Sequence, residues 1–122
     1  MSTVLVVDDE FGIVDLIDAI LSDEGYRVLK AANGRQALEL AATEHPDLLF
    51  LDYMMPVMDG AATLRQMARE PELKLIPVVL MSSLPETTVV ERCGGYISFM
   101  RKPFKIATVV QLAEQLIGVK KA

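Results

Sequence analysis

The sequence has little of three things that would each point to a particular class of protein: cysteine, positive charge and long apolar runs. Its one cysteine, Cys93, excludes an internal disulfide framework and a zinc site built from several cysteines. So few cysteines also suit a reducing compartment. The 12 basic side chains are outnumbered by 17 acidic ones, and the net charge of −5 argues against a general electrostatic surface for direct nucleic-acid binding.

The segments that direct a protein into or across a membrane are also missing. The opening MSTVLVVDDE lacks the charged n-region and the long apolar h-region of a signal peptide. No apolar run approaches the roughly 20 residues that a membrane-spanning helix needs. We therefore expect a cytoplasmic protein without membrane insertion.

What the sequence does have is the size and composition of one folded domain. It holds 122 residues, of which 52% are hydrophobic and 24% charged, and these values are ordinary for a globular chain. A chain of this length buries enough surface for one core. We expect residues 1–122 to form a single domain.

Short apolar runs alternate with amphipathic patterns along the chain. The runs at residues 4–7, 27–31, 48–51, 77–81 and 96–100 predict strands. Helical spacing predicts helices at residues 13–24, after the N-cap residue Asn33, at 61–69 and at 105–116. In the first of these the apolar residues fall at Ile13, Leu16, Ile17 and Ile20. Such alternation indicates an α/β fold, with a parallel sheet covered by helices on both faces.

The segment between the fourth and fifth expected strands is the weakest helix of the series. It runs from Pro85 to Cys93, and residues 87–90 are four β-branched residues in a row. Because β-branched side chains lose rotational freedom in a helix, the pattern predicts a short or distorted fourth helix.

Polar side chains gather at the carboxyl ends of the expected strands, where open α/β sheets bind their ligands. These residues are Asp8, Asp9, Glu10, Asp52, Ser82, Ser83 and Lys102. Three aspartates brought together repel one another, and a hard cation such as Mg²⁺ removes that conflict. With such a cation a carboxylate can take up a phosphoryl group, while a lysine and a hydroxyl contact its oxygens.

Four motifs in register carry a resemblance to a known family: VLVVDDE, LLFLDYMMPVMDG, PVVLMSS and FMRKPF. With them the chain resembles the receiver domain of response regulators in two-component signalling, and in particular the single-domain chemotaxis regulators. The resemblance implies a flavodoxin-like, doubly wound (βα)5 fold with strand order 2-1-3-4-5.

The resemblance also implies a role for each matching residue. Asp52 matches the phosphoacceptor, and Lys102 matches the lysine that binds the phosphoryl group. Ser82 and Phe99 match the switch hydroxyl and the switch aromatic, and the Lys102–Pro103 bond is expected to be cis. Mg²⁺ is the implied cofactor, and the residues that match its ligands are Asp8, Asp9 (the more direct of the two), Asp52 and the backbone carbonyl of Met54.

In this reading the protein is a signalling switch rather than an enzyme with its own substrate. A histidine kinase or a histidine phosphotransfer protein donates a phosphoryl group to Asp52. The switch then controls a downstream protein target through the fourth segment, the fifth strand and the last helix. We expect a stand-alone protein, because the chain starts at Met1 and has no linker-like tail, but a piece excised from a longer regulator or hybrid kinase is the open alternative.

Two other functions compete with this one. The stretch SLPETTVVERCGGY is about two residues shorter than the corresponding family segment, and Tyr96 stands where the family usually has a small residue. We therefore expect this segment to be mobile or remodelled, which favours a phosphorylation-independent protein-binding module. A phosphatase that forms an aspartyl-phosphate is disfavoured, because such enzymes need a second acid where this chain has Met54.

Overall fold

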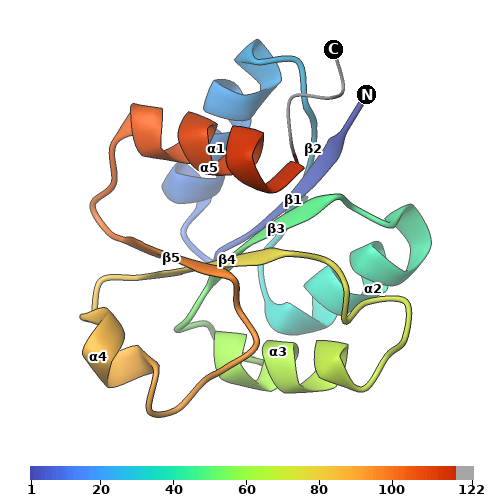
Figure 1. Ribbon diagram of the computed structural model, residues 1–122, viewed down its shortest axis with the longest axis vertical. Helices are drawn as coiled ribbons and strands as arrows, with labels where there is room; N and C mark the ends of the chain where they lie inside the picture. Colours follow the sequence, from blue (N-terminus) through green and yellow to red (C-terminus); the bar gives the residue numbers. More distant parts are fainter. Residues whose placement is uncertain (118–122) are drawn as a thin grey trace.

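Five strands and five helices alternate along residues 1–117, which are the residues that the computed structural model describes (Figure 1). The strands are β1 (Thr3–Val7), β2 (Arg27–Ala31), β3 (Leu48–Asp52), β4 (Val78–Ser82) and β5 (Ser98–Arg101). The helices are α1 (Phe11–Asp23), α2 (Gly34–Glu44), α3 (Gly60–Ala68), α4 (Glu86–Val89) and α5 (Ile106–Ile117). The predicted α/β alternation is confirmed.

The strands form one parallel sheet in the order β2-β1-β3-β4-β5, as the resemblance predicts. The chain moves from β1 to one edge at β2, then crosses back and continues through β3 to the other edge. β1 and β3 are therefore neighbours with the direction of winding reversed between them. In such a sheet a crevice opens at this reversal, beyond the carboxyl ends of the two strands.

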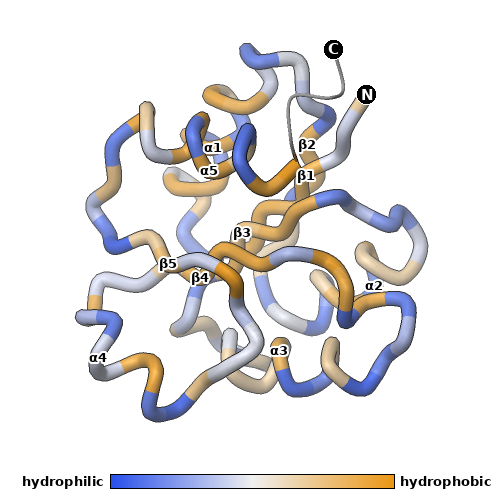
Figure 2. Tube along the Cα trace, in the orientation of Figure 1, coloured by the Kyte–Doolittle hydropathy of each residue, from blue (hydrophilic) through white to orange (hydrophobic). Residues whose placement is uncertain are grey.

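Helices cover both faces of the sheet and bury it. On one face α1 and α5 pack against apolar side chains of the central strands, such as Val6, Phe50 and Met81. On the other face α2, α3 and α4 pack against the alternate residues, such as Leu5 and Leu51. Every residue of β1, β3 and β4 is buried, and these strands form an apolar band through the centre of Figure 2. Burial on both faces explains why they read as continuous apolar runs.

The helices begin where the sequence offers capping side chains. Asn33 accepts a hydrogen bond from the Gln36 amide at the start of α2, as predicted, and Asp59 accepts one from Ala62 at the start of α3. The prediction for α1 is wrong in two respects. The helix begins at Phe11, two residues early, and Leu16 is 43% exposed rather than part of the buried face.

The reason is the tertiary packing of α1. This helix lies against the sheet and against α5, and its buried stripe consists of Val14, Ile17, Ile20 and Leu21. Ile13 is only partly buried. A helix with apolar residues on more than one side can turn any of several faces inward, and the neighbour decides which one is buried.

The fourth helix is a single turn of four residues, which confirms the predicted short helix. Only Val89 and Cys93 of this region are buried. The start of β5 differs from its prediction: the strand begins at Ser98 rather than at Tyr96, and Gly95, with φ at +91°, lies in the irregular segment before it. Pairing with β4 then starts at Ser98, opposite Val79.

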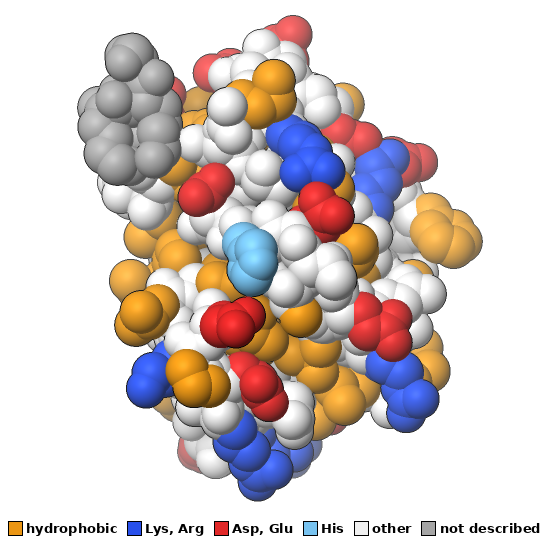
Figure 3. All heavy atoms as spheres, turned by 90° about the vertical axis from the view of Figure 1, so that its right-hand side faces the viewer, with side chains coloured by type: hydrophobic (Ala, Val, Ile, Leu, Met, Phe, Trp, Pro, Cys, Tyr) orange, Lys and Arg blue, Asp and Glu red, His pale blue; other side chains and the backbone are white. Residues whose placement is uncertain are grey.

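Charged side chains of both signs are mixed on the face of the molecule that Figure 3 shows. Figure 3 shows acidic and basic groups interspersed on one face, around the single histidine, His45. Arg27 and Glu44 form an ion pair with 2.9 Å between Nη2 and Oε1. Within residues 1–117 we find no helix of the length and apolar character needed to cross a bilayer.

Candidate functional site

The polar residues singled out in the sequence meet at the carboxyl edge of the sheet. Asp8 and Asp9 follow β1, Asp52 and Ser82 are the last residues of β3 and β4, and Lys102 follows β5. A cleft of about 500 Å³ opens there. Among the residues that line it are Asp9, Glu10, Asp52, Met54, Ser82 and Lys102. The topology therefore brings together the ends of four strands that are far apart in the chain.

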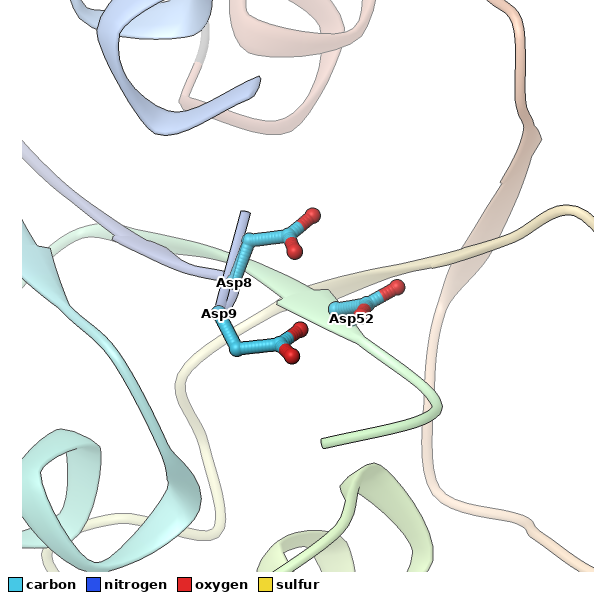
Figure 4. A group of neighbouring side chains, drawn as sticks. All are labelled: Asp8, Asp9 and Asp52. Atoms are coloured by element: carbon cyan, nitrogen blue, oxygen red, sulfur yellow. The ribbon is translucent and has the colours of Figure 1, made fainter. Parts of the chain in front are cut away.

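Three carboxylates lie side by side at this edge of the sheet, and two of them, Asp9 and Asp52, line the cleft. One oxygen each of Asp8, Asp9 and Asp52 falls within 4.8 Å of the others, and Figure 4 shows the three groups directed to the same side. Asp8 is fully buried, Asp52 is 5% exposed and Asp9 is exposed. Oxygen-only ligands with one open side match what Mg²⁺ requires, since this ion keeps several of its waters. The residues present therefore fit such a cation.

The backbone around Asp52 is fixed by close packing. The amide of Tyr53 donates to the carbonyl of Met81 on β4 at 2.9 Å, and the amide of Gly60 donates to the carbonyl of Tyr53 at 2.8 Å. A Cβ at Gly60 would lie 2.7 Å from the backbone oxygen of Asp52. Only glycine allows α3 to begin this close to the end of β3, so the acceptor strand and the loop after it are held together.

Burial and a neighbouring charge make Asp52 a weaker acid than usual. Loss of water is the largest cause, the carboxylate of Asp8 adds to it, and Lys102 opposes it, so that the pKa of Asp52 rises to about 7. Without a cation, the cluster is thus not fully ionised near neutral pH. A divalent ion among the carboxylates would favour the charged form of Asp52.

Lys102 stands in the middle of the acidic residues. Its Nζ lies 2.8 Å from Oδ2 of Asp8, 3.1 Å from Oδ1 of Asp52 and 3.1 Å from Oε1 of Glu10. Burial alone would lower the pKa of Lys102, but the hydrogen bonds to Asp8 and Glu10 and the nearby charge of Asp52 raise it overall. The Lys102–Pro103 bond is cis, as the resemblance predicts.

The contact between Glu10 and Lys102 is the part of the site that the sequence reasoning missed. Glu10 is the third of three consecutive acids after the first expected strand, and its position in the sequence indicates no role for it. The signal available was weak, because exposed acids at the start of a helix are common. The ion pair joins residues that lie 92 positions apart, so only the folded chain shows it.

Ser82 and Phe99 are placed differently from the carboxylates. Ser82 is buried at the cleft, and its Oγ accepts a hydrogen bond from the amide of Leu84 at 3.0 Å. Phe99 is half-buried on β5, against the core that also holds α3 and α4, and its ring centroid is 6.3 Å from that of Tyr96. Phe99 is not among the residues that line the cleft.

A comparison with protein families decides what this arrangement is. The model of the response regulator receiver domain matches residues 4–114. The chain belongs to this family. This receiver domain is 34% identical over 119 residues to sporulation initiation phosphotransferase F of Bacillus subtilis, and the match covers 96% of this chain and 94% of that protein.

Longer relatives and solved structures agree with the assignment. The receiver domain is 38% identical over 127 residues to the regulatory protein AtoC of Escherichia coli, where the match covers 99% of this chain but only 27% of AtoC. The receiver domain of the sensor histidine kinase PA1611 of Pseudomonas aeruginosa was solved with a magnesium ion in its active site cleft. Its TM-score with this chain is 0.89 at 27% identity, with 95% of this chain and 97% of that chain covered.

Proposed function

We propose that this receiver domain is a phosphorylation-controlled switch in two-component signalling, with Asp52 as the phosphoacceptor. The observation that supports this most is the position of the Asp52 carboxylate, which lies at an open cleft between two further aspartates and a lysine. The donor is the phosphohistidine of a histidine kinase or a histidine phosphotransfer protein. Residues 1–122 act as one domain in this proposal.

Mg²⁺ is the proposed cofactor, held by Asp8, Asp9, Asp52 and the backbone carbonyl of Met54. The spacing of the three carboxylate oxygens supports this ligand set, as does the magnesium ion in the similar cleft of PA1611. A bound Mg²⁺ supplies positive charge that offsets the negative charge on the oxygens of a transferring phosphoryl group. Asp9, the most exposed of the three aspartates, offers its carboxylate to the cation at the cleft opening.

The transfer itself uses the carboxylate of Asp52 as the nucleophile. One of its oxygens forms a bond to phosphorus while the bond from phosphorus to the histidine nitrogen breaks, and the electron pair of that bond stays with the imidazole. Lys102, already 3.1 Å from Oδ1 of Asp52, is close enough to donate to a phosphoryl oxygen. The product is an aspartyl phosphate.

The switch works through Ser82 and Phe99 in this proposal. The Ser82 hydroxyl leaves its contact with the Leu84 amide and turns to the phosphoryl group, and Phe99 moves with it. The surface of α4, β5 and α5 then changes for a downstream protein target. That surface exposes apolar side chains, among them Val90, Ile97 and Ile106, which such a partner can cover.

The test is phosphorylation by a small donor. The protein is incubated with acetyl phosphate, with and without Mg²⁺, and its intact mass is measured beside that of Asp52→Asn. We expect one added phosphoryl group, only with Mg²⁺ and only in the wild type. The absence of an adduct from both acetyl phosphate and a panel of phosphorylated histidine phosphotransfer proteins would contradict the proposal and favour the phosphorylation-independent binding module.

A further inference from the structure

The side chain of Glu10 does not do what its position in the fold suggests. Glu10 is the N-cap residue of α1, where a side chain ordinarily accepts a hydrogen bond from the first turn of the helix. Its carboxylate makes no such bond. Instead Oε1 accepts a hydrogen bond from Nζ of Lys102 at 3.1 Å. The side chain of Glu10 thus contacts the lysine of the cleft rather than the first turn of its own helix.

Lys102 is shared among three carboxylates in this arrangement. An ammonium group carries three N–H donors, and three carboxylates lie within 3.1 Å of Nζ. Two of them, Asp8 and Glu10, accept well-formed hydrogen bonds. Asp52 is the third neighbour of Nζ, and a phosphoryl oxygen on Asp52 draws Nζ away from the position in which its bonds to Asp8 and Glu10 hold it.

Glu10 is the partner that Lys102 can leave most easily. The side chain of Glu10 is 63% exposed, whereas those of Asp8 and Asp52 are 0% and 8% exposed. A released Glu10 carboxylate is hydrated by water, whereas Asp8 is fully buried and has no water to replace Lys102, so that only the cation can pair it. Asp52 itself carries the phosphoryl group in the product. Lys102 therefore keeps its contact with this residue, now through a phosphoryl oxygen.

We propose that Glu10 is a positioning residue that holds Lys102 in the unphosphorylated state and gives it up to the phosphoryl group. It competes with the phosphoryl group for the position of Nζ. The inference rests on the proposed function, because it assigns a further residue to the same reaction. Without the negative charge of Glu10, Lys102 is held less strongly on this side before the reaction begins.

The test compares Glu10→Gln with the wild type in acetyl phosphate and saturating Mg²⁺. The rate constant for forming the Asp52 adduct should rise by about two- to fivefold, which is the range expected for losing an exposed ion pair. Asp15→Asn is the matched control, since it removes one negative charge from α1 at a residue that pairs with Lys30 rather than Lys102. Thermal unfolding checks that each variant is folded.

A second comparison, made in the Lys102→Ala variant, separates the contact between Glu10 and Lys102 from a general effect of charge on the rate constant. In Lys102→Ala, the substitution Glu10→Gln should leave the rate constant unchanged, because the competing donor is gone. An equal gain in Asp15→Asn, or a gain that persists with Lys102→Ala, would overturn the inference. Weaker Mg²⁺ binding by Glu10→Gln in calorimetry, together with a slower reaction, would also overturn it. That result would make Glu10 a partner of the cation. If the wild type forms no adduct with any donor, it is the proposed function that fails.

Discussion

At the scale of single residues, Asp52 makes the stability of the metal-free protein depend on pH. Its pKa is about 7 in the folded chain and near 3.8 when unfolded, so the folded state binds more protons between these values. Unfolding then becomes easier as pH rises from about 4 to 7. We expect Asp52→Asn, which carries no charge, to be more stable than the wild type at pH 8 without Mg²⁺, by on the order of 2 kcal/mol.

The measurement is denaturant unfolding of both proteins at pH 5 and pH 8 in a chelator. Near pH 5 the wild-type carboxyl is mostly protonated, so the advantage of Asp52→Asn should shrink there. Added Mg²⁺ should stabilise the wild type more than the variant, because a cation that binds only the folded state stabilises it by mass action. An equal difference at both pH values would show that burial and Asp8 do not raise the pKa of Asp52.

Val57 stores backbone strain in the loop after the acceptor strand. Its φ is +70°, a region that β-branched residues rarely adopt, and its side chain is 72% exposed, so little burial offsets the strain. Asparagine tolerates this conformation much better. We expect Val57→Asn to raise the free energy of unfolding by about 1 kcal/mol, seen as a higher midpoint in denaturant.

Val90 provides the control for this prediction. It is another exposed valine, but its φ is −62°, which is ordinary helical backbone. Val90→Asn should therefore bring no gain in the free energy of unfolding. Equal effects of the two substitutions would mean that exposed apolar surface, rather than backbone strain, limits stability at Val57.

At the scale of elements, the single turn of α4 depends on a contact from outside itself. The hydroxyl of Tyr96 donates to Oε2 of Glu86 at 3.0 Å and ties the start of α4 to the segment before β5. We expect Tyr96→Phe to speed amide hydrogen exchange in residues 85–93 by about two- to fivefold, since an exposed hydrogen bond contributes little more than 1 kcal/mol.

The comparison needs a tyrosine that lies elsewhere. Tyr26 is partly buried between α1 and β2, against the other core cluster, so Tyr26→Phe removes a hydroxyl far from α4. Exchange in residues 85–93 should be unchanged in that variant. If Tyr96→Phe also leaves it unchanged, α4 is held by the buried Val89 and Cys93 alone.

Element types could be predicted from the sequence, but some boundaries and faces could not. Asn33 and Asp59 fix the starts of α2 and α3 because a capping side chain acts locally. The start of β5 was missed because pairing with β4 sets it, and the exposed face of α1 was missed because α5 and the sheet set it. Both depend on neighbours that a local pattern does not contain.

At the scale of the whole molecule, the sheet order turns four separate motifs into one cleft. β1 and β3 lie side by side, β4 and β5 follow, and their carboxyl ends place Asp8, Asp52, Ser82 and Lys102 at one edge. Phe99 is carried by the same strand as Lys102 but contacts the core near α3 and α4. The cleft and the proposed output surface are thus joined by β5.

The sequence by itself determined the alternation of elements, the short fourth helix and the set of polar residues at the strand ends, because periodicity, β-branching and caps act over a few residues. Only the tertiary structure decided which carboxylates surround Lys102 and how strongly burial raises the pKa of Asp52. Lys102 meets Asp8 and Glu10 across more than 90 positions of the chain. Contacts between residues so far apart in the chain, and the loss of water around them, arise only when the strands pair and their carboxyl ends come together.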